Sequence, residues 1–109
     1  MPRSLQRPKD NALPHLLREA LLRSVRGNQP SLTLRELAVL LVISTILDLH
    51  PLHELAARLD ISQKAIGHVA DELEKLDVAG RKLHPSDGRT VLLVATKKGR
   101  AMCRRLTGQ

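Results

Sequence analysis

Residues 50–76 contain two short amphipathic segments separated by a sharp break, and this pattern limits the possible folds more than any other feature of the chain. Apolar residues recur at helical spacing over 52–59 and again over 65–76. Asp60, a residue type that tolerates left-handed backbone, can form the turn between them, and Ser62 is a good N-cap for the second helix. The pattern predicts a helix-turn-helix, although an ordinary helical hairpin has the same spacing.

A predicted β-hairpin directly follows the second of these helices. Residues 81–84 and 90–95 have strand character, and the Asp-Gly pair between them is typical of a tight reversal. A hairpin in this position is the wing of a winged helix. Its tip carries Asp87 and Arg89, and the carboxylate could hold the guanidinium in place. The alternative is a solvent-exposed turn whose arginine serves only solubility.

Further helices are predicted on both sides of this motif. Leucines recur at helical spacing over residues 11–26. Thr33 and Glu36 can form a capping box, and the following residues up to Leu47 are apolar on nearly every side, which is typical of a helix at the centre of a domain or in a subunit contact. The expected fold is mainly α with a small β-hairpin, a winged helix-turn-helix. Its parts are a flexible basic arm (1–10) and one domain (11–109) with a dimerisation helix (11–26) and a short C-terminal helix (97–107).

Positive charge is concentrated at the two ends of the chain and in the predicted hairpin. The chain has 18 Lys and Arg against 11 Asp and Glu, a formal net charge of +7, and residues 97–109 carry five basic and no acidic residues. Such clustering favours a polyanionic partner because each neutralised phosphate releases counterions, although a basic surface can also serve only solubility. The absence of Phe, Tyr and Trp argues against proteins that stack single-stranded bases on aromatic rings.

The chain resembles the MarR (multiple antibiotic resistance regulator) class of winged-helix transcription factors between Thr33 and Gly99. The sequences "LTLRELAVLL", "ELAARLDIS", "ADELEKL" and "DGRTVLLVATKKG" carry the resemblance. In the last of these, Asp87, Arg89, Thr96 and Gly99 match the wing and the start of the helix after it. The resemblance implies a homodimer that binds a near-palindromic operator in double-stranded DNA. It also implies release of the DNA when a small ligand binds, although no effector is evident in the sequence.

The predicted function is sequence-specific binding of double-stranded DNA by a transcriptional regulator. Helix 62–76 would lie in the major groove and hairpin 81–95 at the minor groove. The alternative is a winged-helix adaptor that binds an acidic protein partner and shows little or no sequence-specific DNA binding. The predicted DNA contacts are Ser62, Gln63, Lys64, Gly67, His68, Arg81, Lys82, Ser86, Asp87, Arg89, Lys97 and Lys98.

These contacts have different expected roles. Gln63, Lys64 and His68 would face base edges in the major groove, because polar side chains there can distinguish all four base pairs. Arg89 would enter the minor groove, where the potential is most negative. Basic residues would hold phosphates and fix the register without reading sequence, and these are Arg81, Lys82, Lys97 and Lys98.

Catalysis and metal binding have less support in the sequence. The chain contains no nucleophile elbow, phosphate loop or zinc-protease motif, so we expect neither enzyme activity nor a cofactor. Two histidines three residues apart could approach a metal, but no pair of cysteines accompanies them, and we expect no metal site. The candidate ligands would be His50 and His53, with His68, His84 or Cys103 as further ligands.

Features that direct a chain to a membrane or out of the cell are also missing from the sequence. The longest apolar run, Leu37–Ile43, is shorter than the about 20 residues that span a bilayer, and the first ten residues contain no apolar segment of a secretion signal. The single cysteine, Cys103, cannot form an internal disulfide, and we expect a cytoplasmic protein. Cys103 lies beside Arg104 and Arg105 and could be a redox sensor, although a half-buried, inert thiol is the more common case.

Overall fold

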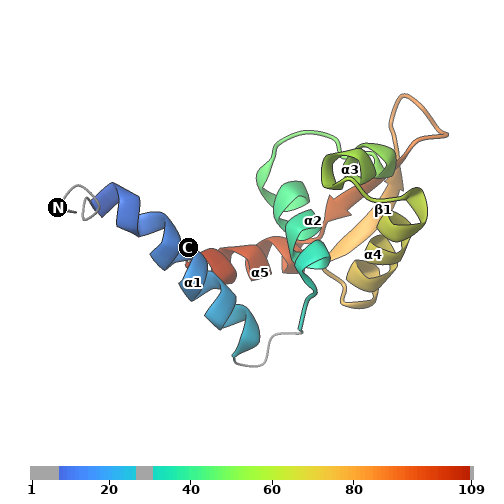
Figure 1. The fold of residues 1–109 in the computed structure, drawn as a ribbon. Helices are drawn as coiled ribbons and strands as arrows, with labels where there is room; N and C mark the ends of the chain where they lie inside the picture. The colour runs from blue at the N-terminus through green and yellow to red at the C-terminus, as the bar shows by residue number, and fades with distance from the viewer. Residues whose placement is uncertain (1–7, 27–30, 109) are drawn as a thin grey trace. The chain divides into compact units, whose positions relative to one another are not determined.

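The structure is a computed structural model that describes residues 8–26 and 31–108, with side chains from residue 12 onward. Its elements follow the predicted order, five helices with a two-stranded antiparallel hairpin before the last helix (Figure 1). The chain divides into two compact units, residues 1–31 with 104–109 (the terminal unit) and residues 32–103 (the winged unit). The elements are α1 (Pro8–Val25), α2 (Leu34–Thr45), α3 (Leu52–Leu59), α4 (Gln63–Lys75), β1 (Ala79–Leu83), β2 (Val91–Ala95) and α5 (Lys97–Thr107).

The terminal unit contains α1, which is longer than the predicted helix 11–26 at its N-terminal end. It begins at Pro8, inside the segment expected to be a flexible arm, and continues through Pro14. Residues 1–7 of that predicted arm lie outside the described residues. The leucine stripe of α1 is exposed, and the side chain of Leu13 is 73% accessible. In the same unit, Arg23 Nη1 donates a hydrogen bond to Leu106 O at 3.3 Å.

The central helix of the winged unit is α2. Its N-terminus has the predicted capping box, in which Thr33 Oγ1 accepts from Glu36 N at 3.1 Å and Glu36 Oε1 accepts from Thr33 N at 2.9 Å. Val39 and Leu40 are completely buried, and the helix contacts both α4 and β2. Of the two positions that its apolar sequence allowed, the structure thus shows the centre of the unit. The helix ends at Thr45, earlier than the apolar run.

Helices α3 and α4 form the predicted helix-turn-helix. Asp60 has the left-handed conformation (φ 55°, ψ 49°) that turns the chain after α3. Ile61 N donates to Ala56 O at 3.0 Å across this turn. Ser62 is the N-cap of α4, and its Oγ accepts a hydrogen bond from Ala65 N at 3.0 Å. The side chains on one face of α4 are buried, namely those of Ile66, Val69, Ala70 and Leu73.

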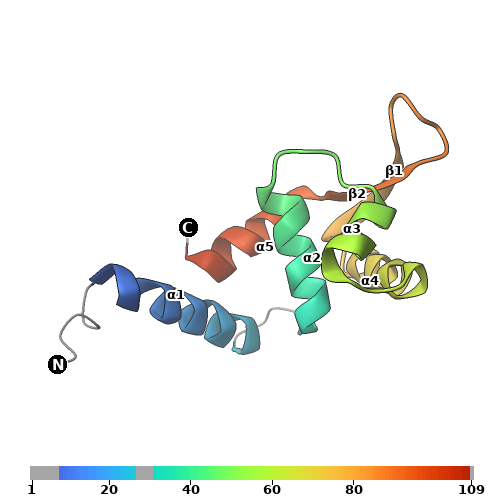
Figure 2. The same cartoon turned by 45° about the horizontal axis from the view of Figure 1, so that its top comes forward.

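Strands β1 and β2 form the predicted wing, with Arg81 opposite Leu93 in the antiparallel register. The loop between them projects beyond the helices of the winged unit (Figure 2). The strand β1 begins at Ala79, earlier than predicted, because the buried Ala79 pairs with the buried Ala95 before the exposed part of the hairpin. The helix-turn-helix is joined to β2 by a bridge between Pro51 and Leu92.

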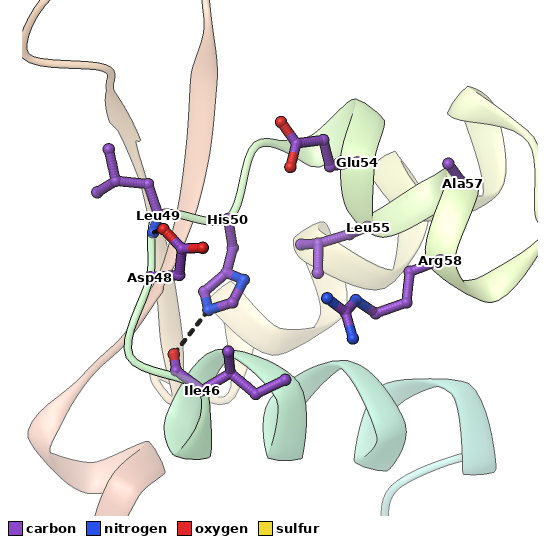
Figure 3. A pocket seen from close by; sticks show the side chains of 8 residues that line it. All are labelled: Ile46, Asp48, Leu49, His50, Glu54, Leu55, Ala57 and Arg58. Atoms are coloured by element: carbon purple, nitrogen blue, oxygen red, sulfur yellow. Dashed lines mark hydrogen bonds between the residues drawn. The ribbon is translucent and has the colours of Figure 1, made fainter.

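The loop between α2 and α3 is held by His50, whose side chain is buried (Figure 3). Its backbone O accepts a hydrogen bond from Leu93 N at 2.9 Å. Its ring Nε2 lies 2.9 Å from Ile46 O. Because a carbonyl oxygen can only accept, Nε2 is the donor in this contact. This residue, considered above as a metal ligand, therefore joins the loop to β2.

The junction between the wing and α5 depends on Thr96 and Gly99, two of the residues that carried the family resemblance. Thr96 Oγ1 donates to Asp77 O at 2.7 Å and accepts from Gly99 N at 3.0 Å, so one hydroxyl caps α5 and holds the turn before β1. A Cβ atom on Gly99 would lie 2.0 Å from Val78 O. Only glycine therefore allows the first turn of α5 to approach this turn so closely.

Candidate nucleic-acid interface

The exposed side of α4 carries the residues predicted to face the major groove. Ser62, Gln63, Lys64 and His68 are all exposed, and Gly67 is half-buried. Lys64 and His68 are four residues apart and lie opposite the buried face of the helix. The cap hydrogen bond occupies a lone pair of Ser62 Oγ and leaves the hydroxyl proton available to a DNA acceptor. The N-terminal half of α4 thus presents polar and basic groups to solvent.

Two further charged side chains of α4 neutralise one another at its C-terminal end. Lys75 Nζ lies 2.9 Å from Glu72 Oε2. This hydrogen bond and the charge of Glu72 raise the pKa of Lys75 above its ordinary value. The acidic residues of α4, Asp71, Glu72 and Glu74, all lie beyond its N-terminal half.

The side chain of Arg81 on β1 contacts α4. Its Nη1 forms ion pairs with Asp71 Oδ1 at 3.0 Å and with Glu74 Oε1, and its Nη2 donates to Gly67 O at 3.1 Å. The Arg81 side chain is 30% exposed. Neighbouring Lys82 is exposed, and the structure gives it no ion pair among the described residues.

The tip of the wing is ordered by Asp87, but not through the guanidinium of Arg89. Asp87 Oδ1 accepts from the backbone N of Arg89 at 3.0 Å, and Oδ2 accepts from Thr90 Oγ1 at 2.7 Å. The bond from Thr90, followed by that from Arg89, lowers the pKa of the Asp87 carboxyl. The suggested Asp87–guanidinium pair was wrong, because the carboxylate is used by closer donors of its own turn. The Arg89 side chain is exposed to solvent.

The remaining predicted contacts lie at two different places, the tip of the hairpin and the first turn of α5. Ser86 is exposed at the tip, where its backbone N donates to His84 Nδ1 at 3.0 Å. Lys97 and Lys98 are exposed in the first turn of α5, beyond the other end of β2 from the tip. The five residues of β2 separate them from the tip by about 15 Å. The polar groups at the wing tip and those at the start of α5 are therefore two separate sets.

Arg35, which the sequence interpretation missed, lies near the exposed side of α4. With His68 it lines an open groove of about 550 Å³ between the start of α2 and α4. Arg35 is exposed and lies within the capping box of α2, two residues after the N-cap Thr33. Its position within "TLRE" gave a signal for a helix start but none for its proximity to α4, because that proximity depends on how the helices pack.

A second cavity, of about 350 Å³, lies beside the loop between α2 and α3 (Figure 3). Arg58 extends into it from the last turn of α3, and His50 and Leu55 form its inner side. In the part of the chain with described side chains, no group of three or more His, Cys, Asp or Glu is arranged to hold a metal ion. None of the helices in the described ranges has the length and apolar character of a membrane-spanning segment.

The Cys103 thiol is buried against α2, and its Sγ lies 3.8 Å from Leu40 O. Burial raises the pKa of the thiol above its ordinary value. The reactive thiolate is therefore disfavoured, which supports an inert buried thiol over the redox sensor.

The proteins found to be similar to this chain are solved structures. No family model and no curated protein matches the sequence. CouR from Rhodococcus jostii RHA1, solved with p-coumaroyl-CoA bound, is 26% identical with a TM-score of 0.68 over 86% of this chain. The transcriptional regulator Tm0710 from Thermotoga maritima is 19% identical with a TM-score of 0.76 over 97% of this chain and 72% of its own.

A MarR-family transcriptional regulator from Rhodococcus sp. RHA1 is 23% identical, with a TM-score of 0.66 over 86% of this chain. The present chain covers 62% of the length of CouR and 61% of that regulator. Tm0710 and the protein from Rhodococcus sp. RHA1 are named as transcriptional regulators. The chain therefore has the winged-helix fold of MarR-family transcriptional regulators.

Proposed function

We propose that this protein is a transcriptional regulator that binds double-stranded DNA sequence-specifically, with α4 in the major groove and the wing at the minor groove. The observation that carries the proposal is the position of two exposed groups in one unit. These are the polar N-terminal half of α4, with Lys64 and His68, and the projecting wing tip with Arg89. The MarR-like fold supports the same conclusion.

The side chains have distinct roles in this proposal. Gln63, Lys64 and His68 read base edges, and Arg89 enters the minor groove. The half-buried Gly67 allows the main chain of α4 to approach the DNA. Ser62 and Ser86 contact the DNA backbone, and Asp87 orders the wing tip that meets it. Exposed basic residues hold phosphates, namely Arg35, Lys82, Lys97 and Lys98.

The protein acts in this proposal as a homodimer in the cytoplasm, without a cofactor or catalytic activity. The exposed apolar stripe of α1, with Leu13, Leu17 and Val25, is the surface that a second copy would cover. Two copies related by a twofold axis would bind an inverted repeat. CouR was solved with p-coumaroyl-CoA, so we include a small-molecule effector of unspecified class.

Selection of bound sequences from a random duplex pool tests this function. A sequence-specific dimer should enrich an inverted repeat, and with about six phosphate contacts its affinity should fall with salt at a log-log slope of about −5. A protein adaptor, the alternative function, would bind random duplex negligibly and enrich no sequence.

The role of Arg89 can be tested on the selected operator. Replacement of Arg89 by Ala should weaken binding by about 1 to 3 kcal/mol if the guanidinium makes a specific groove contact. The variant Arg89→Lys keeps the charge without the planar guanidinium and should restore only part of the affinity. Unchanged affinity of Arg89→Ala would remove this residue from the interface.

A further inference from the structure

We infer that Arg81 is a positioning residue that fixes the wing relative to the recognition helix α4 and does not contact phosphate. This inference rests on the proposed function, because the relative position of the two elements matters only if both meet the same duplex. It reassigns a residue that the sequence alone grouped with the phosphate contacts.

The contacts of Arg81 extend along one side of α4. Its guanidinium reaches Gly67 O, Asp71 Oδ1 and Glu74 Oε1, which are spaced by four and three residues. This spacing places the three groups on the same side of the helix, facing β1. The backbone N of Arg81 also donates to Glu74 Oε2 at 3.3 Å. Side chain and main chain of one strand residue thus hold two successive turns of α4.

The planar guanidinium makes this arrangement possible. The acceptor at position 67 is a backbone carbonyl, and a Cβ there would meet no atom within 4 Å, so this contact does not depend on glycine. Arginine presents several N–H donors in one rigid plane and can serve two carboxylates and a carbonyl together. A lysine ammonium cannot span the same three acceptors in a fixed geometry.

The ion pairs also neutralise the positive charge of Arg81, which a phosphate contact would need. Arg81 faces two carboxylates, those of Asp71 and Glu74, so the cluster of these three side chains has a formal charge of −1. A phosphate approaching Arg81 would meet this negative cluster. Lys82, the next residue on β1, points to the opposite face of the strand, is exposed and has no acidic partner among the described residues. It is the matched control.

The two roles predict opposite effects when Glu74 is replaced. If Arg81 contacted phosphate, Glu74→Ala would remove a negative charge and release the guanidinium, so DNA binding would become tighter and more salt-dependent. If Arg81 positions the wing, Glu74→Ala loosens the contact between β1 and α4, and operator binding becomes weaker despite the gain in positive charge.

The experiment measures operator affinity as a function of salt for the full-length protein and the variants Arg81→Ala, Arg81→Lys, Glu74→Ala and Lys82→Ala. Arg81→Ala and Glu74→Ala should each weaken binding about tenfold with an unchanged salt slope, and Arg81→Lys should not restore it. Lys82→Ala should reduce the slope by about 0.9 for each lost phosphate contact. The exchanged pair Arg81→Glu with Glu74→Arg should recover part of the affinity lost by Arg81→Ala.

Hydroxyl-radical footprinting adds a readout that loss of stability alone would not change. With the folded fraction confirmed by circular dichroism, Arg81→Ala should lose protection of the flanking minor groove and keep protection of the central major groove. A reduced salt slope for Arg81→Ala, tighter binding by Glu74→Ala or an intact wing footprint would each overturn the inference. If the wild-type protein binds no duplex, the proposed function fails first and this inference fails with it, whereas the other outcomes contradict only the role of Arg81.

Discussion

Gly99 shows how a single residue type determines the junction between the wing and α5. The helix approaches the turn before β1 so closely that a methyl group would overlap Val78 O. We expect Gly99→Ala to reduce the free energy of unfolding by about 1 to 3 kcal/mol, because the packed turn must shift to admit the methyl group. Urea denaturation measures this change. Gly80→Ala is the control, since a Cβ there has no neighbour within 4 Å and the stability should change much less.

Gly67 lies in the interior of α4 and has the opposite expected effect on stability. Space is available for a methyl group, so Gly67→Ala should raise the free energy of unfolding by about 0.5 to 1 kcal/mol through the higher helix propensity of alanine. If Gly67 approaches DNA, as proposed, the same variant should bind the operator more weakly. A more stable protein with unchanged operator affinity would remove Gly67 from the predicted DNA contacts.

The wing is an element whose tip depends on one carboxylate. Asp87 has a lowered pKa in the folded chain, so its ionised form contributes order above the ordinary pKa of about 3.8, and this contribution is lost as the pH falls through the folded value. We expect Asp87→Ala to speed amide hydrogen exchange at Arg89 at neutral pH, because the Arg89 N–H loses its carboxylate acceptor. Exchange at Thr90, whose N–H donates to Asp87 O, should also become faster, because the turn loses the bond from Thr90 Oγ1. Exchange measured by NMR should remain unchanged in α4. Equal protection in variant and wild type would contradict this role.

Sequence patterns predicted the elements better than the contacts between them. The capping box at Thr33, the left-handed turn at Asp60 and the N-cap at Ser62 are local features, and each could be read from a few neighbouring residues. The ion pairs of Arg81 could not be predicted in this way. They join residues up to ten positions apart, and they require a known orientation of β1 against α4.

The candidate interface was predictable to a similar extent. Exposure of Lys64 and His68 followed from helical periodicity, and that of Arg89 from its place in a turn. The distance of Lys97 from the wing tip followed only from the folded hairpin. The position of Arg35 beside His68 likewise depends on packing between α2 and α4. Basic composition therefore identified candidates, and the fold separates them into different sets.

Among the described residues, exposed large apolar side chains are concentrated on α1. We expect a mass in solution of about twice 12.1 kDa, because a second copy would remove this surface from water. Light scattering of Leu17→Glu should give the monomer mass, since a charge would be placed on the covered face. Leu47→Glu, at a leucine that is 99% exposed in the loop after α2, is the matched control and should stay dimeric. A monomeric wild-type protein would contradict the proposed homodimer.

The bridge from Pro51 to Leu92 and the bond from Leu93 N to His50 O have a consequence for control of the molecule. They tie the wing to the segment just before α3, so we expect the hairpin and α3 to move together when the chain meets another molecule. In the proposed dimer, a signal that releases DNA would then alter the separation of the two winged units or block their outer surface, while the contact between wing and α3 persists.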